Sequence, residues 1–308
     1  MNGMRAAMGD VGTGDIRRMK GNHMTYLVTA ASGHLGRLAV ESLLTRGVDS
    51  AEIVAGARNP ERIQDLAARG VRTVELDYDR PGTVAAALEG IDRILLISGS
   101  APGARVAGHL NVIEAATAAG VERIVYTSAP QATTFDWALG ADHRATEEAI
   151  TASGLPAVIV RNNWYTENYA GDLERAAESG VIASSVGDAR IASASRVDYA
   201  AGAAVALVED GHVGNVYEFA GDVAWTFDDL AAAASVVLGR EVTYQRLTSE
   251  QLAAGLEAAG ADSGTVGFVV GLDQAIAGGV LSGTDGTLAR LIGRPTTPLI
   301  DGLRALRA

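Results

Sequence analysis

The feature that most constrains the fold of this chain is a regular alternation of short apolar runs and amphipathic segments between residues 25 and 163. Each apolar run is followed by a segment whose hydrophobic residues recur with the period of an α-helix. Strands that are apolar on both faces belong to parallel sheets covered by helices on each side. The pattern therefore predicts an α/β fold, specifically a Rossmann-type doubly wound parallel sheet.

The bounds of these elements follow from the turn residues between them. Pro60 stands in the first turn of one predicted helix, and Gly70 follows the end of that helix. The predicted strands are 25–30, 51–57, 71–77, 92–98, 122–128 and 156–162. The predicted helices are 35–47, 59–70, 80–90, 105–120 and 142–154.

Beyond residue 164 the alternation loosens, and the sequence predicts a smaller C-terminal α/β substrate lobe. Its elements are a helix from near Asp198, a strand over 215–222, a helix over 226–239, a strand over 241–247 and a helix over 248–260. The predicted organisation is a flexible N-terminal extension over 1–23, a Rossmann domain over 24–163, and a substrate-binding lobe over 164–308 that is intergrown with it. The extension lacks the apolar core of a secretory signal.

The composition excludes several classes of chemistry. The chain has no cysteine, so disulfides, thiolate catalysis and cysteine-ligated metals are excluded. Among its 25 basic residues Lys20, in the N-terminal extension, is the only lysine. Catalytic mechanisms that need a lysine in the folded body are therefore excluded, including the Tyr-x-x-x-Lys dyad of ordinary short-chain dehydrogenases. The five histidines have no metal-ligand spacing, so no metal site is predicted.

Charge and hydropathy limit the partners. The net charge of −12 disfavours nucleic acid, because a nucleic-acid binder uses a surplus of Lys and Arg to displace phosphate counterions. No apolar run approaches the roughly 20 residues of a membrane-spanning helix. We therefore expect neither a nucleic-acid nor a membrane partner, and a cytoplasmic protein.

The segment "VTAASGHLG", residues 28–36, has the form of a dinucleotide-binding turn between a strand and a helix. Gly33 and Gly36 let the backbone approach a pyrophosphate and let the helix pack close to the strand. The free amides at the helix start then bind the anion. Ala30 stands where such turns usually carry glycine, but it adds only one methyl group, which a slightly wider turn accommodates. The alternative is a tight structural turn without a ligand.

The end of the second strand, "ARNPER", indicates which cofactor is preferred. An NAD site usually carries Asp or Glu about 20 residues after the glycines, where it binds the ribose 2′-hydroxyl. Here Arg58 stands at the strand tip and no acid does. An arginine offers a forked donor for a 2′-phosphate, so the sequence predicts NADPH rather than NADH. The alternative is a solvated arginine beside a helix start.

Together these segments resemble the NmrA-like, atypical short-chain dehydrogenase/reductase family and, within it, the bacterial type 2 NAD(P)H:quinone oxidoreductases. The resemblance runs from about Thr25 to Leu306 and departs from the usual pattern at Ala30 and Asn163, where glycine is expected. The segments that carry it are "VTAASGHLG", "ARNPER", "LLIS", "YTS", "SGLP", "RNNWYTENY", "GDARIASASRVDYAAGAA", "YEFAGDVAWT", "VTYQ" and "LIGRPTTPL". "RNNWYTENY" is the most specific of them.

The resemblance implies a cofactor site built from segments that each follow a predicted strand. The pyrophosphate would lie against the turn, and Arg58 would meet the 2′-phosphate. Ser98 and Ser100 would lie by the ribose and nicotinamide. The residues implied at the turn are Ala30, Ala31, Ser32, Gly33, His34, Leu35 and Gly36. Those that would close over the nicotinamide are Asn162, Asn163, Trp164, Tyr165, Thr166 and Glu167.

The same segment predicts a pocket for a flat acceptor, because aromatic faces stack on conjugated rings. The substrate-binding residues are expected to be Trp164, Tyr165, Asn168 and Tyr169. The amides of Asn162 and Asn168 would donate hydrogen bonds to a quinone carbonyl. The alternative for Trp164 is ordinary packing between the lobes.

His143 and Tyr165 are the expected catalytic residues. In isoflavone-reductase-like relatives a catalytic lysine occupies the place of His143, and an imidazole titrates near neutral pH. We therefore expect His143 to supply or relay a proton to the reduced quinone oxygen. The alternative is a surface histidine near a helix start.

The predicted function is hydride transfer from NADPH to a small quinone, which requires the protein mainly to align the cofactor and the acceptor. A second hypothesis is an NADPH-binding redox sensor of the NmrA type, which signals to a protein partner without catalysis. A third, a sugar-nucleotide epimerase or dehydratase, conflicts with the missing Tyr/Lys dyad. A homodimer is compatible with all of these readings.

Overall fold

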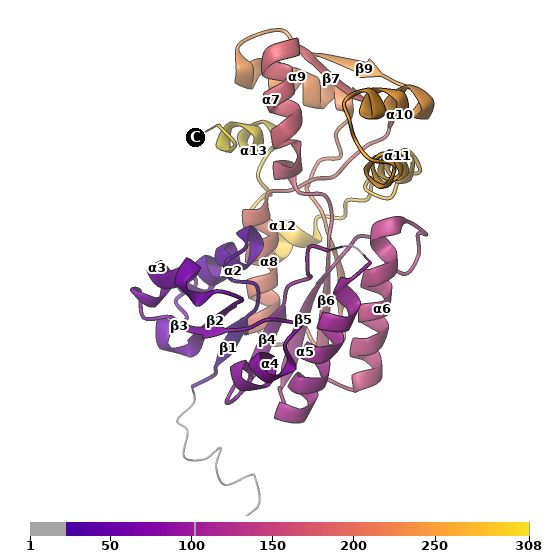
Figure 1. The fold of residues 1–308 in the computed structure, drawn as a ribbon. Helices are drawn as coiled ribbons and strands as arrows, with labels where there is room; N and C mark the ends of the chain where they lie inside the picture. Colours follow the sequence, from indigo (N-terminus) through magenta and orange to yellow (C-terminus); the bar gives the residue numbers. More distant parts are fainter. Residues whose placement is uncertain (1–22, 102, 308) are drawn as a thin grey trace, which may run out of the picture.

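The computed structural model describes residues 23–101 and 103–307. The N-terminal extension expected over 1–23, with Lys20, therefore lies outside the described residues, His23 excepted. The described chain forms two bodies, one above the other in Figure 1, joined by several crossings of the backbone. The lower body holds the large sheet, and the upper body holds a small sheet and most of the C-terminal helices.

The lower body is built on a seven-stranded sheet in which all neighbouring strands are parallel. Its order is β3-β2-β1-β4-β5-β6-β8, so the chain moves outward from β1 to β3 and then crosses back to β4. The strands are β1 (Tyr26–Val28), β2 (Ile53–Ala57), β3 (Arg72–Glu75), β4 (Arg93–Leu96), β5 (Arg123–Ser128), β6 (Ala157–Asn162) and β8 (Val216–Phe219). The predicted doubly wound sheet is confirmed, and the strand order reverses between β1 and β4.

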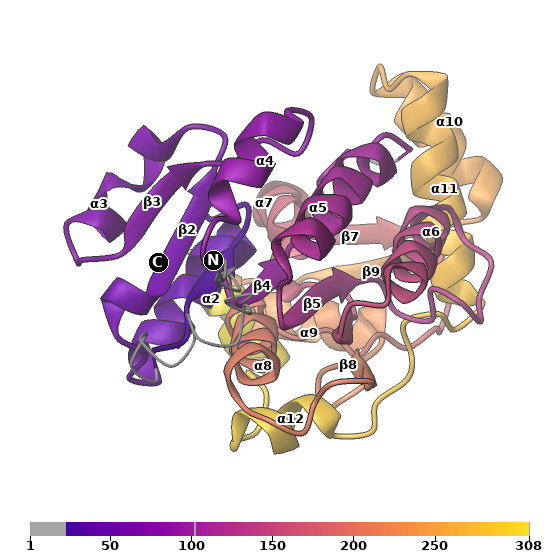
Figure 2. The same ribbon diagram turned by 90° about the horizontal axis from the view of Figure 1, so that it is seen from below.

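Helices cover both faces of this sheet (Figure 2). Along β4, Ile94 and Leu96 point into one hydrophobic core while Leu95 and Ile97 point into the other, as the twofold period of a strand requires. One face is covered by α4 (Pro81–Ala87), α5 (Arg105–Ala119) and α6 (Ala138–Ser153). The other is covered by α2 (His34–Thr45), α3 (Gln64–Ala67), α8 (Arg196–Val208) and α12 (Thr287–Ile292).

Two helices differ from the sequence prediction. The helix expected over 59–70 is a 3-10 turn, η2 (Pro60–Ile63), followed by the single turn α3. The side chain of Asn59 accepts a hydrogen bond from the amide of Glu61, which starts this tight turn. The helix expected to begin at residue 142 begins at Ala138 instead, so its first turn precedes the segment that carries the helical pattern.

The upper body contains a two-stranded parallel sheet of β7 (Val181–Ser184) and β9 (Thr243–Arg246). This body has a separate hydrophobic core, which includes four buried aromatic side chains, those of Trp137, Tyr169, Trp225 and Phe227. The helices of this body are α7 (Ala170–Ser179), α9 (Phe227–Leu238), α10 (Ser249–Ala258), α11 (Ser263–Ala277) and α13 (Leu299–Ala305). The short helix η3 (Thr166–Tyr169) connects β6 to this body.

The two bodies are intergrown, and the sequence boundary expected at 163/164 does not separate them in space. Helix α8 and strand β8 both follow residue 164, yet α8 packs against α2 and β8 pairs with β6. The guanidinium groups of Arg93 and Arg123, at the amino ends of β4 and β5, fix the end of α8. Arg93 donates to the carbonyl of Val208 at 2.7 Å, and Arg123 donates to that of Glu209 at 2.5 Å. Cations suit this end of a helix because it carries the negative end of the helix dipole.

Candidate active site

The turn after β1 lies where the strand order reverses, which is where ligands of doubly wound sheets bind. Ala30 adopts a φ of +49°, and in the described chain Gln131 is the one other non-glycine residue with a positive φ. The alanine therefore takes the left-handed conformation that glycine would supply, at a cost of about 1–2 kcal/mol. The amide of Ala31 is held by the carbonyl of Gly56 at 2.8 Å. A left-handed alanine, rather than a wider turn, is how this sequence accommodates the missing glycine.

Gly36 brings α2 onto the backbone of this turn. A Cβ atom at position 36 would lie 2.3 Å from the carbonyl oxygen of Ala30, a distance that no side chain tolerates. A Cβ atom at Gly33 would lie 3.3 Å from the same oxygen. Gly33 is also the N-cap of α2 and supplies no side-chain cap. The first amides of α2 are thus left without a side-chain acceptor, which is the arrangement that binds anions at helix starts.

Arg58 directly follows β2 and is exposed. Within the described residues it forms no hydrogen bond or ion pair. The nearby Arg37, in contrast, is paired with the carboxylate of Asp65 and is not available to a ligand. Arg58 is therefore the uncompensated cation at the tip of the second strand.

At the carboxyl end of β4, Ser98 and Gly99 are held by buried side chains. The amide of Ser98 donates to Thr127 Oγ1 at 2.9 Å, and Ser98 Oγ accepts a hydrogen bond from Arg105 at 3.1 Å. The amide of Gly99 donates to Nε2 of His109 at 3.0 Å. Ser100 is exposed. The first two positions of this loop are therefore fixed before any ligand binds.

His109 is completely buried, and its hydrogen bonds define its tautomer. Its Nε2 accepts from Gly99, so the proton is on Nδ1, which lies 2.9 Å from Thr146 Oγ1. Thr146 in turn donates to the carbonyl of Asp142 at 2.8 Å. Burial, with the cation of Arg105 as a smaller cause, lowers the pKa of His109 to about 4. This histidine is therefore neutral at physiological pH.

The structure corrects the expectation for His143. Its side chain is buried in α6, with Nδ1 2.8 Å from Tyr126 Oη and Nε2 3.1 Å from Arg105. Burial first, and then the cation of Arg105, lowers its pKa to about 3. The expectation that His143 titrates near neutral pH is therefore wrong, and so is the alternative of a surface histidine. Neither burial nor the arginine was visible in the sequence.

After β6, the two asparagines have different surroundings. Asn163 is fully engaged, because its Nδ2 donates to the carbonyl of Leu281 and its Oδ1 accepts from the amide of Trp164. Asn162 is 5% exposed, its Oδ1 has no partner within the described residues, and its Nδ2 reaches Tyr165 Oη only at 3.5 Å. An unpaired buried amide costs about 1–3 kcal/mol. Asn162 thus has hydrogen-bonding capacity to offer a ligand, and Asn163 does not.

Arg196, at the start of α8, organises the following segment and was not anticipated from the sequence. Its guanidinium lies 4.6 Å from the centre of the Tyr165 ring and donates to Asn168 Oδ1 at 2.9 Å. Its amide donates to Glu167 at 2.8 Å. The signal that could have found it is its position next to Ser195, the N-cap of α8. Tyr165, Glu167 and Asn168 are consequently held together by one side chain.

The remaining residues of the segment face the upper body. Tyr169 is buried in its core, with its ring 5.2 Å from Trp225 and 5.9 Å from Phe227. Thr166 is buried, and its hydroxyl lies 2.9 Å from Ser193 Oγ. Trp164 is half-buried against the same core. Tyr169 is therefore a core residue in this structure, and Trp164 is placed between the core and the surface.

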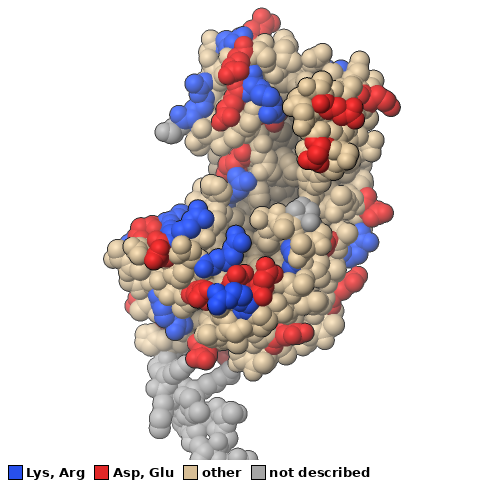
Figure 3. Space-filling view, in the orientation of Figure 1, with Lys and Arg blue, Asp and Glu red and all other residues tan. Residues whose placement is uncertain are grey.

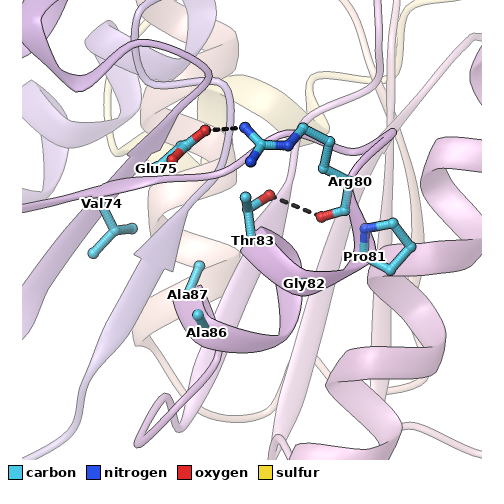
Figure 4. A pocket seen from close by; sticks show the side chains of 8 residues that line it. All are labelled: Val74, Glu75, Arg80, Pro81, Gly82, Thr83, Ala86 and Ala87. Carbon is cyan, nitrogen blue, oxygen red and sulfur yellow. Dashed lines mark hydrogen bonds and ion pairs between the residues drawn. The ribbon is translucent and has the colours of Figure 1, made fainter.

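The surface is hollowed between the two bodies, with acidic and basic side chains on the rim (Figure 3). Two smaller hollows lie elsewhere. The one in Figure 4 lies between β3 and α4 and is lined by residues such as Thr83 and Arg80, which pairs with Glu75. The second lies at the carboxyl ends of β6 and β8 and includes Asn163. Neither contains the glycine turn or Arg58.

Comparison with known proteins identifies the family. Residues 30–208 match the family described as NAD(P)H-binding. The chain is 42% identical to quinone oxidoreductase 2 of Escherichia coli K12 over 91% of its own length and 97% of that protein's. It is 29% identical to an NmrA-like family domain-containing oxidoreductase of Aspergillus flavus over 92% of this chain and 95% of that one. The chain belongs to the NAD(P)H-binding family, and its relatives include an NmrA-like oxidoreductase.

Solved structures of this family agree with the fold. The E. coli NADPH-dependent quinone oxidoreductase complexed with NADPH matches with a TM-score of 0.88 and 42% identity, over 92% of this chain and 100% of that one. A Citrobacter triphenylmethane reductase complexed with NADP(H) matches with a TM-score of 0.86 and 34% identity, over the same shares. The predicted family, fold and cofactor class are confirmed. In the described residues no group of His, Asp and Glu could hold a metal ion, and no helix is long and apolar enough to cross a membrane.

The contact between α2 and the turn gives a stability prediction. We expect Gly36→Ala to lower the melting temperature by at least about 5 °C, because the new methyl group meets backbone atoms that cannot move aside. Ala30→Gly should leave it unchanged or slightly higher, since the relief of the left-handed strain is offset by the freedom of glycine in the unfolded chain. Gly82→Ala is the control, because a Cβ atom there meets nothing within 4 Å. Equal melting temperatures for Gly36→Ala and Gly82→Ala would contradict the contact.

The two buried histidines predict how stability depends on pH. In the unfolded chain a histidine titrates near 6.5, whereas His109 and His143 titrate at about 4 and about 3 in the folded state. As the pH falls below about 6.5, the unfolded chain takes up protons that the folded chain does not, so the free energy of unfolding decreases. The slope is at most about 1.4 kcal/mol per pH unit for each histidine.

Urea unfolding at pH 7, 6 and 5 measures this slope. His109→Gln should reduce the dependence of the unfolding free energy on pH, because one of the two buried histidines is then absent. This holds whatever the effect of the substitution on stability at pH 7. His34→Gln, at an exposed position, should not change this dependence on pH. A wild-type stability that is constant between pH 7 and pH 5 would show that these imidazoles are accessible to protons.

Proposed function

We propose that this protein transfers a hydride from NADPH to a small quinone. The observation that carries the proposal is its 42% identity, over nearly the whole of both chains, to a quinone oxidoreductase whose solved structure contains NADPH. The geometry supports it, because uncapped amides, a free cation and an unpaired buried amide all lie at the carboxyl edge of the sheet.

The proposed cofactor site follows that edge. The pyrophosphate would lie at the start of α2, against the turn that is completed by Ala31, Ser32, Gly33, His34, Leu35 and Gly36. Arg58 would pair with the 2′-phosphate, since it has no partner of its own. Ser98 and Ser100 would line the ribose and nicotinamide. Asn163 would support this site through the backbone rather than by contact, because its side chain is already engaged.

The proposed acceptor site lies beyond the nicotinamide position, toward the upper body. Asn162 would donate to a quinone carbonyl through Nδ2, which reaches Tyr165 Oη only at 3.5 Å, and its unpaired Oδ1 would accept from the hydroxyl of the hydroquinone formed. The ring of Tyr165 is held by Arg196 on its face and by Tyr199 at its edge, 5.3 Å away. Trp164, Thr166, Glu167 and Asn168 would complete the entrance, and Tyr169 would support it from the core.

When bound, NADPH supplies the hydride, and the chain supplies position and hydrogen bonds. Reduction of a quinone to a hydroquinone also needs a proton. His143 is neutral and buried, and burial raises the pKa of Tyr165 above its ordinary value. Neither side chain is an acid at neutral pH, so we assign the proton to water. Tyr165 acts as a neutral hydroxyl that donates a hydrogen bond to the acceptor.

We propose a cytoplasmic location, since NADPH is produced there, and a small quinone as the partner. The homodimer stays a prediction, which light scattering tests directly. The competing hypothesis of a redox sensor without catalysis requires NADPH binding but no turnover, and the activity measurement below separates the two.

Cofactor choice is tested at Arg58. We expect NADPH to bind more tightly than NADH, and Arg58→Ala to weaken NADPH binding about tenfold or more, because hydrogen bonds to charged groups contribute about 1.5–3 kcal/mol. NADH binding should barely change. Isothermal titration calorimetry with both cofactors measures this.

The matched control is Arg72→Ala. Arg72 is also exposed, but it stands at the amino end of β3, at the opposite edge of the sheet. The Arg72→Ala variant should bind both cofactors with the affinities of the wild type. Equal affinities of the wild type for NADPH and NADH would refute the role of Arg58.

The reaction is tested by following NADPH oxidation at 340 nm (about the usual absorbance maximum of the reduced nicotinamide) with benzoquinone. We expect turnover, and we expect Asn162→Ala to lower kcat/KM for the quinone about tenfold to a hundredfold, the effect of losing a buried hydrogen-bond donor. The NADPH dissociation constant should stay within about twofold. Asn215→Ala is the control, because that side chain donates only within its own turn. Tight NADPH binding without oxidation by any quinone would favour the redox sensor.

A further inference from the structure

Arg105 occupies an unusual place for a cation. It is the first residue of α5, where the positive end of the helix dipole opposes it, and its side chain is 8% exposed. In the described chain Asp142 is the carboxylate within ion-pair distance, 3.2 Å from Nε. Asp142 is itself held by the amide of Gly103 at 2.6 Å. Burying a charge here costs stability, which argues that the guanidinium does something besides packing.

The same guanidinium nitrogen reaches two acceptors. Arg105 NH1 lies 3.1 Å from Ser98 Oγ and 3.1 Å from His143 Nε2. An arginine can only donate, so both of these atoms must accept. The single proton of neutral His143 is therefore on Nδ1, from which it is donated to Tyr126 Oη at 2.8 Å. Arg105 thus decides the tautomer of His143.

The series of donors and acceptors that starts at Arg105 continues through Tyr126. Because its oxygen accepts from His143, its own proton points to one of two hydroxyl oxygens within reach, those of Thr146 and Ser98. Thr146 already accepts from His109 and donates to the carbonyl of Asp142. One path of donors therefore starts at the amide of Gly99 and runs through His109 and Thr146 to the carbonyl of Asp142. A second path starts at Arg105 and reaches Ser98, in the loop after β4.

Ser98 is the end of this chain of hydrogen bonds. Its oxygen accepts from Arg105, so its proton is free to be donated. Within the described residues, the acceptor given for it is the carbonyl of the adjacent Gly99, at 3.3 Å. Ser98 follows β4, which is the neighbour of β1 at the point where the strand order reverses. Its hydroxyl is thus a donor at the edge where a dinucleotide lies.

We propose that Arg105 is a positioning residue for hydride transfer, which orients Ser98 as a hydrogen-bond donor to the nicotinamide half of NADPH and holds His143 in its neutral Nδ1–H tautomer. The inference rests on the proposed function, because it needs the cofactor at the end of β4. It assigns the two histidines to a fixed, neutral scaffold beneath the cofactor rather than to proton transfer.

In a variant without Arg105, the protonation of the His143 imidazole depends on the other groups that face it. They are His109 on α5, Tyr126 on β5, and Asp142 and Thr146 on α6. Loss of the arginine removes both the donor at Nε2 and the nearby cation. Nε2 then has no donor that keeps it unprotonated, so His143 can adopt either neutral tautomer, while burial still holds its pKa below the ordinary value. The Nδ1–H tautomer is therefore no longer fixed.

The test compares Arg105→Met with the conservative Arg105→Lys. In the wild type, NMR of the imidazole nitrogens should show His143 as the neutral Nδ1–H tautomer, unchanged between pH 5 and pH 8. Arg105→Met should release His143 to a mixture of the two neutral tautomers, because Nε2 loses the donor that kept it unprotonated. Arg105→Lys should keep the Nδ1–H tautomer.

Cofactor binding tests the second half of the inference. Ser98→Ala and Arg105→Met should each raise the NADPH dissociation constant about fivefold, and the double variant should raise it no further, because both remove one hydrogen bond. Arg144→Met is the control, since Arg144 neighbours His143 on α6 but donates to the carbonyl of Ala132. Arg144→Met should change neither the tautomer of His143 nor the binding of NADPH.

The outcomes separate the two proposals. An Nε2–H tautomer of His143 in the wild type, or a pure Nδ1–H tautomer retained in Arg105→Met, would overturn the role of Arg105 even if the protein is a quinone reductase. Failure of the wild type to bind NADPH would instead defeat the proposed function, whereas the NMR measurement needs no cofactor. Thermal melting of Arg105→Lys and Arg105→Met confirms that both variants are folded.

Discussion

The close approach of α2 to the turn after β1 is the contact on which the rest of the site depends. With glycine at position 36, the helix rests directly on the carbonyl of Ala30, so its first amides face the edge of the sheet. The strand behind the turn is fixed by Thr29, whose hydroxyl donates to the carbonyl of Leu95 and accepts from the amide of Ile97. These bonds align β1 with β4 at the edge of the sheet where the proposed cofactor site lies.

The sequence was sufficient for the sheet and for the turn, because both depend on local patterns. Apolar runs separated by helical segments define parallel strands wherever they occur, and glycines at fixed spacing define a close approach of backbone atoms. The sequence predicts both β6 and β8 as strands, but it does not predict that β8 pairs with β6. The composition of four residues can indicate an extended conformation, but it does not indicate which of two sheets the strand joins.

The surroundings of the polar side chains were much less predictable. His143 lies on the buried face of α6, and the helical pattern alone did not indicate that a buried hydroxyl and a buried arginine would meet it there. Asn162 and Asn163 are neighbours of the same residue type, yet only Asn162 keeps an unsatisfied amide. Such differences arise from contacts between segments far apart in the chain, as with Arg196 and Tyr165, so no local pattern carries them.

The buried polar cluster explains how the fold dispenses with the lysine of ordinary short-chain dehydrogenases. Its two imidazoles are each fixed by a donor on one side and an acceptor on the other, so neither exchanges protons readily. In the proposed reaction the hydride comes from the cofactor and the proton from water, so the protein needs fixed positions for its side chains more than it needs an acid. The cluster provides such fixed positions next to the end of β4.

The fixation of α8 by Arg93 and Arg123 bears on how this protein can be divided. The carbonyls that those guanidinium groups bind come from residues after 200, whereas the arginines belong to the first half of the chain. A fragment ending after β6 would keep two buried cations without acceptors and would expose the strand edge that β8 covers. The Rossmann body therefore cannot be expressed as a separate module by truncation.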